Sequence, residues 1–431
     1  MKETFIEFFT FSYPNITYVV VGTVLLSISS ALVGCFTFLR KKSLVGDVVS
    51  HAVLPGICLS FLLTGYKNPL IIVAGAFFTG WLSIAALDYV VRHSKIKEDT
   101  ATGLSLSVFF GLGILLLTFI QHSGNAQQTG LDAFLFGKAA ALVGQDLIVF
   151  GILAVITLLM VLAFFKEFQI IAFDQQFATS MGLPVKSIEM ILTSVTVLAV
   201  VAGIQAVGVV LMAAMLITPA ATAKFWTDRL QVMLLLAAIF GAFSGITGAF
   251  ISYAAPAMPT GPWMVMVLSF LALISFFFAP QKGILVRLLR QRRIRRKQLE
   301  ENLLKAFYAV GERLGTFDKP LTLDQIGEKR SFRPEELRIG LRRLVSHGYL
   351  RRQQSDWQLT ADGLSKGRRV QRLHRLWELY LTEYLSIAPD HVHEDAESIE
   401  HVITPELELE LERLLDHPIH DPHQSVIPSR D

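Results

Sequence analysis

Histidines and glutamates recur at helical spacing in the last part of the sequence. The set comprises His374, Glu378, His393, Glu397, Glu400 and His401. The first two are one helical turn apart and the other four follow at i, i+4, i+7 and i+8, so each group lies along one helix face. Nitrogen and oxygen ligands without cysteine suit Mn²⁺ or Fe²⁺ at least as well as Zn²⁺. The pattern predicts a metal site, with a solvated surface helix as the alternative.

A second pair of polar residues lies near the other end of the chain, in "LVGDVVSHAVLPG" (44–56). Asp47 and His51 are one helical turn apart inside an apolar stretch, where ionisable groups are costly and usually line a pathway. The alternative is that Asp47 caps the helix while His51 bonds to a neighbouring backbone group. Two ligands bind a metal weakly, so a second copy of the chain across a two-fold axis would complete the site and favours a homodimer.

Apolar stretches long enough to span a bilayer surround this pair. Of the 431 residues, 52% are hydrophobic and 17% charged, and the apolar stretches stop near Pro280, beyond which charge is dense. Nine spans are expected near 17–38, 46–65, 69–91, 102–121, 146–166, 188–204, 206–223, 231–253 and 262–279. The sixth and seventh are separated at "GIQAVG" (203–208), with one long tilted helix as the alternative.

The expected fold is mainly α-helical, a polytopic membrane domain followed by a soluble part. The expected order is a transmembrane domain (1–280), a basic linker (281–298), a winged-helix domain (299–370) and a helical metal-binding and dimerisation region (371–431). Cys35 and Cys58 fall inside apolar spans, which suits buried small residues better than a disulfide. A net charge of +3 does not by itself indicate a nucleic-acid partner.

Basic residues set the expected orientation. The short connections carrying Arg40 and Arg92 should be cytoplasmic, as should the basic segment 287–297 after the last span. That segment is more typical of a membrane-surface anchor than of a DNA contact. With these connections inside, the N-terminus is expected outside, and nine crossings place the C-terminal part in the cytoplasm. The first residues resemble no cleavable signal peptide.

A polar stretch, "FDQQFATSMGLPV" (173–185), interrupts the spans on the expected cytoplasmic side. Asp174 is a typical helix start, and Gly182 with Pro184 is a typical helix stop. The stretch therefore predicts a short helix, with an idle loop as the alternative.

This stretch, with "GDVVSHAVLPG", "EDTATGLSLSVFF" (98–110), "GVVLMAAMLITPAATA" (208–223) and "PTGP" (259–262), resembles the permease family of ABC transporters for manganese, zinc and iron, over about residues 15–280. The resemblance implies a homodimer in the bacterial plasma membrane with a separate ATPase and an extracellular metal-binding protein. It implies that Asp47 and His51 lie on the metal route. It further implies a coupling helix that contacts the ATPase, with Asp174, Gln175, Ala178 and Gly182 in it. The chain has no phosphate-binding G-x-x-x-x-G-K-[ST] motif, so we expect it to bind no nucleotide and to be no enzyme by itself.

The soluble part resembles a winged helix. Helices are expected in 299–315, 321–329 and 333–350, and two short strands in 349–360. Leu337, Leu341 and Leu344 share one face of the third helix. The candidate DNA contacts on its other faces are Arg338, Arg342 and Arg343. A protein-docking module with a solvated arginine face is the alternative. Thr360 is the expected cap of the following long helix.

Residues 299–428 resemble the metal-dependent repressors of the diphtheria-toxin-repressor and manganese-regulator family. Their sensor helices are matched by His374, Glu378, Glu397, Glu400 and His401, and "DPHQSVIP" (421–428) resembles their tail. Asn302 and Lys305 stand where the first helix of these repressors supplies metal ligands. An amide is a poor ligand and an ammonium repels a cation, so we expect metal to order the sensor without closing the winged helix onto DNA.

Together these features predict the permease subunit of an ATP-driven importer of a divalent transition metal, with a cytoplasmic metal-sensing tail. Manganese is the expected cargo, with iron or zinc as alternatives. A membrane-tethered, metal-responsive transcription regulator is the alternative. It would need only one anchoring span and no polar residues inside the spans. An ion-gradient-driven transporter would favour internal repeats with paired broken helices, and none is evident.

Overall fold

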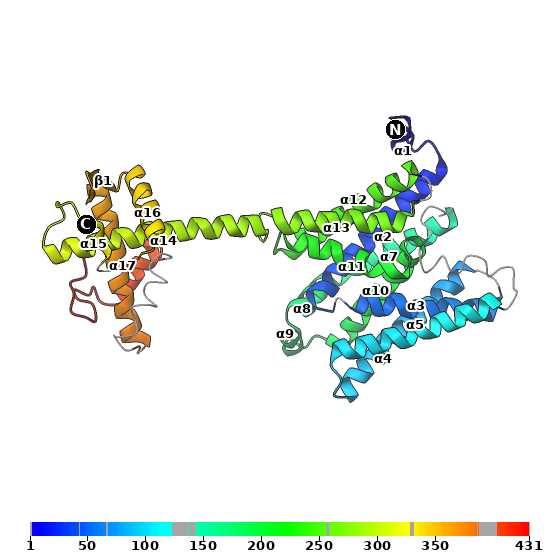
Figure 1. Cartoon of the computed structure of the whole chain (residues 1–431). Coiled ribbons are helices and arrows are strands. Elements are labelled where there is room, and N and C mark those ends of the chain that lie inside the picture. The colour runs from blue at the N-terminus through cyan, green and yellow to red at the C-terminus, as the bar shows by residue number, and fades with distance from the viewer. Residues whose placement is uncertain are drawn as a thin grey trace. The chain divides into compact units, whose positions relative to one another are not determined.

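The computed structural model of the chain divides into two compact units, Met1–Arg287 and Leu288–Asp431 (Figure 1). The structure describes residues 2–42, 44–65, 68–122, 137, 144–255, 258–327, 332–385, 387 and 403–430.

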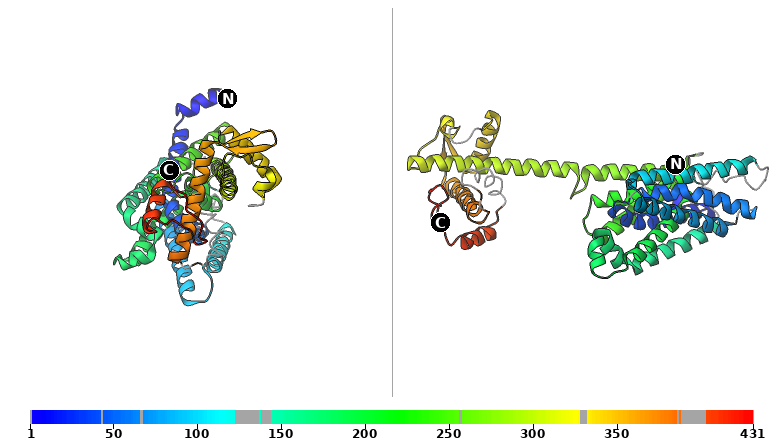
Figure 2. Two further views of the ribbon diagram at one scale, coloured as in Figure 1. Left: turned by 90° about the vertical axis from the view of Figure 1, so that its left-hand side faces the viewer. Right: turned by 90° about the horizontal axis from the view of Figure 1, so that it is seen from below.

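The first unit is built from helices. They are α1 (Lys2–Phe9), α2 (Pro14–Leu39), α3 (Val45–Thr64), α4 (Pro69–His93), α5 (Glu98–His122), α7 (Gly144–Ala163), α8 (Phe165–Phe173), α9 (Gln175–Ser180), α10 (Val185–Val207), α11 (Val209–Lys224), α12 (Leu230–Ala254) and α13 (Thr260–Phe278). Local signals set several starts: proline occupies the first turn of α2, and the Asn68 side chain accepts a hydrogen bond from the Leu70 amide at the start of α4. The long helices run side by side in the right-hand view of Figure 2.

The expected count of nine spans is approximate. Seven helices in the described part of the chain are long and apolar enough to cross a bilayer, and the pair α7 and α8, bent by 69°, makes an eighth if it is one span. Helix α11 is apolar but has only 16 residues. A span of about 20 residues matches the hydrocarbon thickness, so α11 alone is short for a full crossing.

The break expected at "GIQAVG" lies at Gly208. Its φ of 89° and ψ of 161° are essentially restricted to glycine, and α10 ends and α11 begins on either side of it. Gly203 and Met212 contact each other across the break, since a Cβ on Gly203 would lie 2.3 Å from the Met212 sulfur. In a straight helix these residues would be about 13 Å apart. The single long helix is therefore wrong.

Helix α2 lies at the centre of this unit and packs against α7, α10, α11 and α12. It is apolar on all sides and largely buried, as expected for a helix surrounded by others. Small residues bring its neighbours close: Gly241 and Gly245 of α12 face the backbone of Ser27 and Thr23. In a bilayer such close van der Waals packing drives helix association, because lipid is as apolar as the side chains.

The second unit begins within a long helix. Its elements are α14 (Ile284–Leu314), α15 (Leu323–Gly327), α16 (Pro334–Ser346), β1 (Leu350–Gln353), β2 (Asp356–Leu359), α17 (Ala361–Leu385) and α19 (Pro405–Leu414). The basic segment 287–297 is thus helical and continuous with the first winged-helix helix. The expected short strands are confirmed, paired antiparallel with Leu350 opposite Leu359.

The winged-helix core forms where the apolar pattern predicts it. Leu341 and Leu344 are buried with Leu303, Phe307 and Ile326 in one cluster, and Leu337 packs against it. Thr360 caps α17 as expected: its hydroxyl accepts a hydrogen bond from the Gly363 amide at 3.1 Å.

Candidate metal path, coupling segment and sensor

Asp47 and His51 lie one turn apart near the start of α3. The residue that caps this helix is Leu44, which makes no side-chain cap, so Asp47 is inside the first turn and does not serve as the N-cap. The neighbouring Val48, Val49 and Ala52 are completely buried. A rigid, packed helix therefore holds the carboxylate and the imidazole at a fixed spacing.

His51 is half-buried beside α5. Its ring meets the ring of Phe110 edge-on, with 4.7 Å between the centroids. Its Nδ1 atom is buried and has no hydrogen-bond partner in the described part of the chain. The expected alternative, a bond from this nitrogen to a backbone group, is not observed there. A buried imidazole nitrogen with nothing to bind is costly, and it is available to a ligand.

The coupling segment has the start and stop that its sequence predicts. The Asp174 carboxylate accepts a hydrogen bond from the Phe177 amide at 2.9 Å. At the other end Gly182 has φ of +76°, and the amides of Gly182 and Leu183 donate to the carbonyls of Thr179 and Ala178 at 3.0 and 3.2 Å. These two bonds form a Schellman motif. The predicted short helix is therefore confirmed as α9 (Gln175–Ser180).

One face of this segment is buried and another is apolar but exposed. Ala178 is fully buried in the core of the first unit, while Gln175 is exposed. Phe173, Phe177 and Met181 follow at intervals of four residues, and each is more than half exposed. We name these three residues the coupling stripe. Sequence reasoning concentrated on the polar residues and missed it, although the four-residue spacing was visible.

In the second unit the His374 and Glu378 side chains are buried on α17, with 3.0 Å between His374 Nε2 and Glu378 Oε1. The other predicted ligands, His393, Glu397, Glu400 and His401, lie outside the described residues. In the ranges that are described, no group of three or more potential ligands gathers. Asn302 and Lys305 lie on the largely buried face of α14, and the Asn302 Oδ1 atom is buried without a partner there.

The three candidate DNA contacts on α16 differ. Arg338 and Arg342 are exposed. Arg343 donates from Nε to a carboxylate oxygen of the buried Glu300 at 2.6 Å, and His347 lies 3.3 Å from the other oxygen. Arg343 therefore holds α16 against α14 and is not on the exposed face expected for it.

Two arginines of α17 hold the end of the chain, a role that the sequence did not predict. Arg375 donates to both carboxylate oxygens of Glu312 at 2.9 and 2.7 Å and lies 3.4 Å from Asp421. Burial alone would lower the pKa of Arg375, but these carboxylates more than offset burial and raise it. Arg372 pairs with Glu412 of α19 at 2.5 Å and thereby lowers the pKa of that carboxyl group.

Residues 12–279, more than half of the chain, match the ABC 3 transport family. The chain belongs to this family. It is therefore a multi-pass membrane permease subunit of an ABC importer, not an enzyme by itself, and the ATPase is a separate chain. Residues 360–429 match a second family, the iron dependent repressor, metal binding and dimerisation domain. Both resemblances inferred from the sequence motifs are confirmed.

Individual relatives agree with this assignment. The permease is 41% identical over 377 residues to the manganese transport system membrane protein MntC of Bacillus subtilis, covering 87% of this chain and 86% of that protein. It is 44% identical to the zinc transport system membrane protein TroC of Treponema pallidum, covering 66% and 95%. The structure of PsaBC from Streptococcus pneumoniae in complex with Fab superposes with a TM-score of 0.59 at 35% identity, covering 67% of this chain and 99% of that one.

Proposed function

We propose that the permease imports a divalent transition metal, with manganese as the primary cargo, and that the cargo passes Asp47 and His51. The observation that carries this proposal is the buried Nδ1 atom of His51, one turn from a carboxylate, which has no hydrogen-bond partner among the described residues. One oxygen and one nitrogen ligand, with no thiolate nearby, suit Mn²⁺, Fe²⁺ and Zn²⁺. Relatives named for manganese and for zinc support this set of cargoes.

A homodimer would complete the site. Two copies across a two-fold axis bring two carboxylates and two imidazoles to the metal, whereas one copy offers two ligands. An extracellular metal-binding protein would deliver the ion to this dimer, and the N-terminus would lie outside with the tail in the cytoplasm. The basic residues at the corresponding span ends support that orientation.

The coupling stripe would contact the ATPase, and the fold offers a short route from there to the metal. Helix α9 is followed after four residues by α10. Val197 and Val201 of α10 share an apolar cluster with Val49 and Val53 of α3, on either side of His51. Close-packed helices move as bodies, so displacement of α9 by the ATPase would shift α10 against α3 and open the metal path to one side.

Metal uptake by single variants tests the proposal. Asp47→Asn and His51→Ala should each reduce manganese uptake by more than about tenfold, because a weak site loses one of its few ligands. Asp99→Asn is the matched control, since Asp99 is an exposed carboxylate in the first turn of another span. The amount of permease and its assembly with the ATPase should not change. Normal uptake by both variants at normal protein levels would contradict the proposal.

A second role for the tail has one observation in its favour. Arg338 and Arg342 are exposed on the third helix of a winged-helix unit, where they can reach phosphates. Such contacts alone would give weak, salt-sensitive binding to DNA of any sequence. Metal sensing through His374, Glu378 and the four ligand candidates that follow them is the role we propose for the tail, and feedback on transport is its output.

A further inference from the structure

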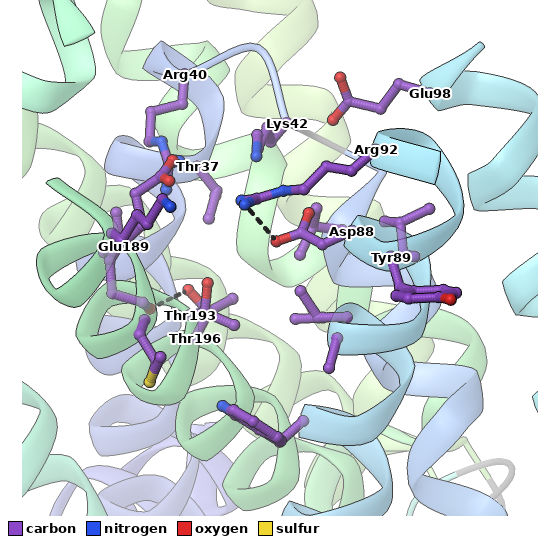
Figure 3. Close-up of a pocket in the computed structure, with 18 of the residues that line it drawn as sticks. Thr37, Arg40, Lys42, Asp88, Tyr89, Arg92, Glu98, Glu189, Thr193 and Thr196 are labelled. Carbon is purple, nitrogen blue, oxygen red and sulfur yellow. Dashed lines mark hydrogen bonds and ion pairs between the residues drawn. The ribbon is translucent and has the colours of Figure 1, made fainter. Parts of the chain in front are cut away.

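A cavity of about 410 Å³ opens in the first unit among the ends of α2, α4, α5 and α10 (Figure 3). Its inner walls are apolar and include Val45, Trp81, Ile84, Met190 and Leu192. Charged side chains of both signs gather at its other end. A volume of this size is typical of a small-molecule site, and the division into an apolar and a charged part indicates an amphiphilic ligand.

Four of the charged groups in the cavity neutralise one another. Arg40 pairs with Glu189, and Arg92 lies 4.0 Å from Asp88 on the opposite wall (Figure 3). These pairs join α2 to α10 and brace α4. The remaining charged groups that line the cavity are therefore available to pair with a ligand.

The remaining groups are two ammoniums and one carboxylate. Lys42, Lys186 and Glu98 line the cavity and have no ion pair within the described residues. Lys42 and Glu98 point toward the charged end of the space from different elements (Figure 3). Two cations and one anion are complementary to a ligand that carries one phosphate and one amine.

The depth of these residues in the membrane identifies the source of the ligand. Lys42 follows the end of α2, Lys186 is the second residue of α10, and Glu98 is the first residue of α5. All three helices are candidate spans, so the charged end of the cavity lies where hydrocarbon gives way to lipid headgroups. A lipid can enter such a cavity from the bilayer itself.

We propose that this cavity is a binding site for a phospholipid whose headgroup carries a phosphate and a primary amine, as in phosphatidylethanolamine. Lys42 and Lys186 bind the phosphate, Glu98 accepts a hydrogen bond from the ammonium, and an acyl chain packs on Trp81 and Ile84. A phosphatidylglycerol headgroup gives Glu98 no cation. The methylated amine of phosphatidylcholine has no proton to donate to Glu98. The proposal depends on the membrane location of the permease and not on the identity of its cargo.

Native mass spectrometry of the purified, delipidated full-length permease tests this site. Phosphatidylethanolamine, phosphatidylglycerol and phosphatidylcholine are added in turn, with glycerophosphoethanolamine and inorganic phosphate as probes without acyl chains. The wild type should retain phosphatidylethanolamine at least about tenfold more strongly than the other lipids, a difference of about 1.4 kcal/mol. The two probes without acyl chains should compete poorly, because they make no contact with the apolar walls.

Variants assign the binding to this cavity. Lys42→Gln with Lys186→Gln should retain all three lipids at least about tenfold less strongly than the wild type, because each lipid carries the phosphate. Glu98→Gln should bind phosphatidylethanolamine and phosphatidylglycerol equally. Lys95→Gln with Lys97→Gln is the matched control, because these exposed lysines do not line the cavity. Equal lipid retention by the Lys42 and Lys186 variant and by this control would overturn the proposal. So would equal binding of the three lipids by the wild type, or full competition by inorganic phosphate. If the double lysine variant fails to assemble, the lipid selectivity of Glu98→Gln alone decides the question.

Discussion

Gly34 sets how closely α2 and α11 approach each other. A Cβ at this position would lie 1.8 Å from the carbonyl oxygen of Leu216, which is backbone and cannot move aside alone. The Leu216 side chain in turn contacts the position of Gly46, just before Asp47. One hydrogen atom in place of a methyl group thus links the packing of the central helix to the helix that carries the proposed metal ligands.

Gly34→Ala should therefore both destabilise the permease and impair transport. Forcing two packed backbones apart costs about 1–3 kcal/mol, so the variant should show a lower thermal unfolding midpoint in detergent and reduced metal uptake. Gly151→Ala is the control, because a Cβ there meets no atom of the described residues within 4 Å. A variant with alanine at 34 that keeps the wild-type midpoint would contradict the close approach of the two backbones.

Residues whose role is set by their chain neighbours were predictable, and residues whose role depends on distant ones were not. Asp174 and Gly182 act through bonds within a few residues, so their types alone indicate a helix start and stop. The pairing of Arg40 with Glu189 joins positions 149 apart in sequence. Each residue has charged or polar neighbours in the sequence that could form an ion pair equally well. Only the packing of α2 against α10 brings Arg40 and Glu189 together.

At the scale of elements, α9 and the residues at its two ends carry the coupling stripe, which is exposed on the first unit. Phe177→Ser with Met181→Ser should weaken assembly with the ATPase, since exposed apolar side chains contribute most when a partner buries them. Neither residue is part of the core, so the permease itself should fold normally. Co-purification of the ATPase with the permease measures the effect. Thr179→Ala, at an exposed position of the same helix, is the control.

This prediction also separates docking from later steps. If the ATPase still co-purifies with the double variant while uptake is lost, the stripe acts after assembly. If assembly and uptake are both unchanged, the ATPase contacts another surface of the permease.

The contact between α17 and α19 should depend on pH through Glu412. Arg372 lowers the pKa of the Glu412 carboxyl group in the folded state, so the unfolded state binds the proton more readily. The stabilisation is fully present above the usual glutamate pKa of about 4.3 and is lost as pH falls through the lower folded value. Hydrogen exchange of the α19 amides, corrected for the intrinsic effect of pH, should therefore accelerate between about pH 5 and 3.

Glu412→Gln should remove this dependence and leave α19 less protected at neutral pH. Glu410→Gln is the control, because Glu410 is exposed on the same helix. An unchanged pH profile in the Glu412 variant would mean that other groups hold α19 to α17.

At the scale of the whole molecule, the chain joins a transport unit to a unit related to repressors. The order of units was predictable because hydropathy changes abruptly near Pro280 and each unit carries local motifs. The number of spans was not predictable, since α11 has only 16 residues, short for a bilayer crossing, and the pair α7 and α8 is bent. Apolar length alone does not distinguish a full crossing from a broken or short helix.

The covalent union of the two units favours feedback on transport over control of transcription. A tail that lies in the cytoplasm and senses the imported ion, as proposed above, would respond to the product of its own permease and would need no DNA to act. The buried pair of His374 and Glu378 is already assembled on α17. Asn302 and Lys305, by contrast, offer no good ligands on the first winged-helix helix. Metal should then order the sensor region without a matching change in DNA affinity.

Glu378→Gln tests this feedback in the full transporter. The substitution keeps the shape of the side chain but removes a carboxylate ligand, so the sensor should need more metal to respond. Manganese uptake should rise above wild type at high external metal and equal wild type at low metal, where the sensor is empty in both. Glu383→Gln, exposed on the same helix, should behave as wild type. Reduced uptake at every metal level would indicate a folding defect and is checked by hydrogen exchange of α17.

Two results together would contradict feedback and support a transcriptional role for the tail. The first is unchanged uptake by the Glu378 variant at high metal. The second is tight, metal-dependent binding of the protein to one DNA sequence, abolished by Arg338→Gln and Arg342→Gln, because exposed arginines on the third helix would then contact the bases.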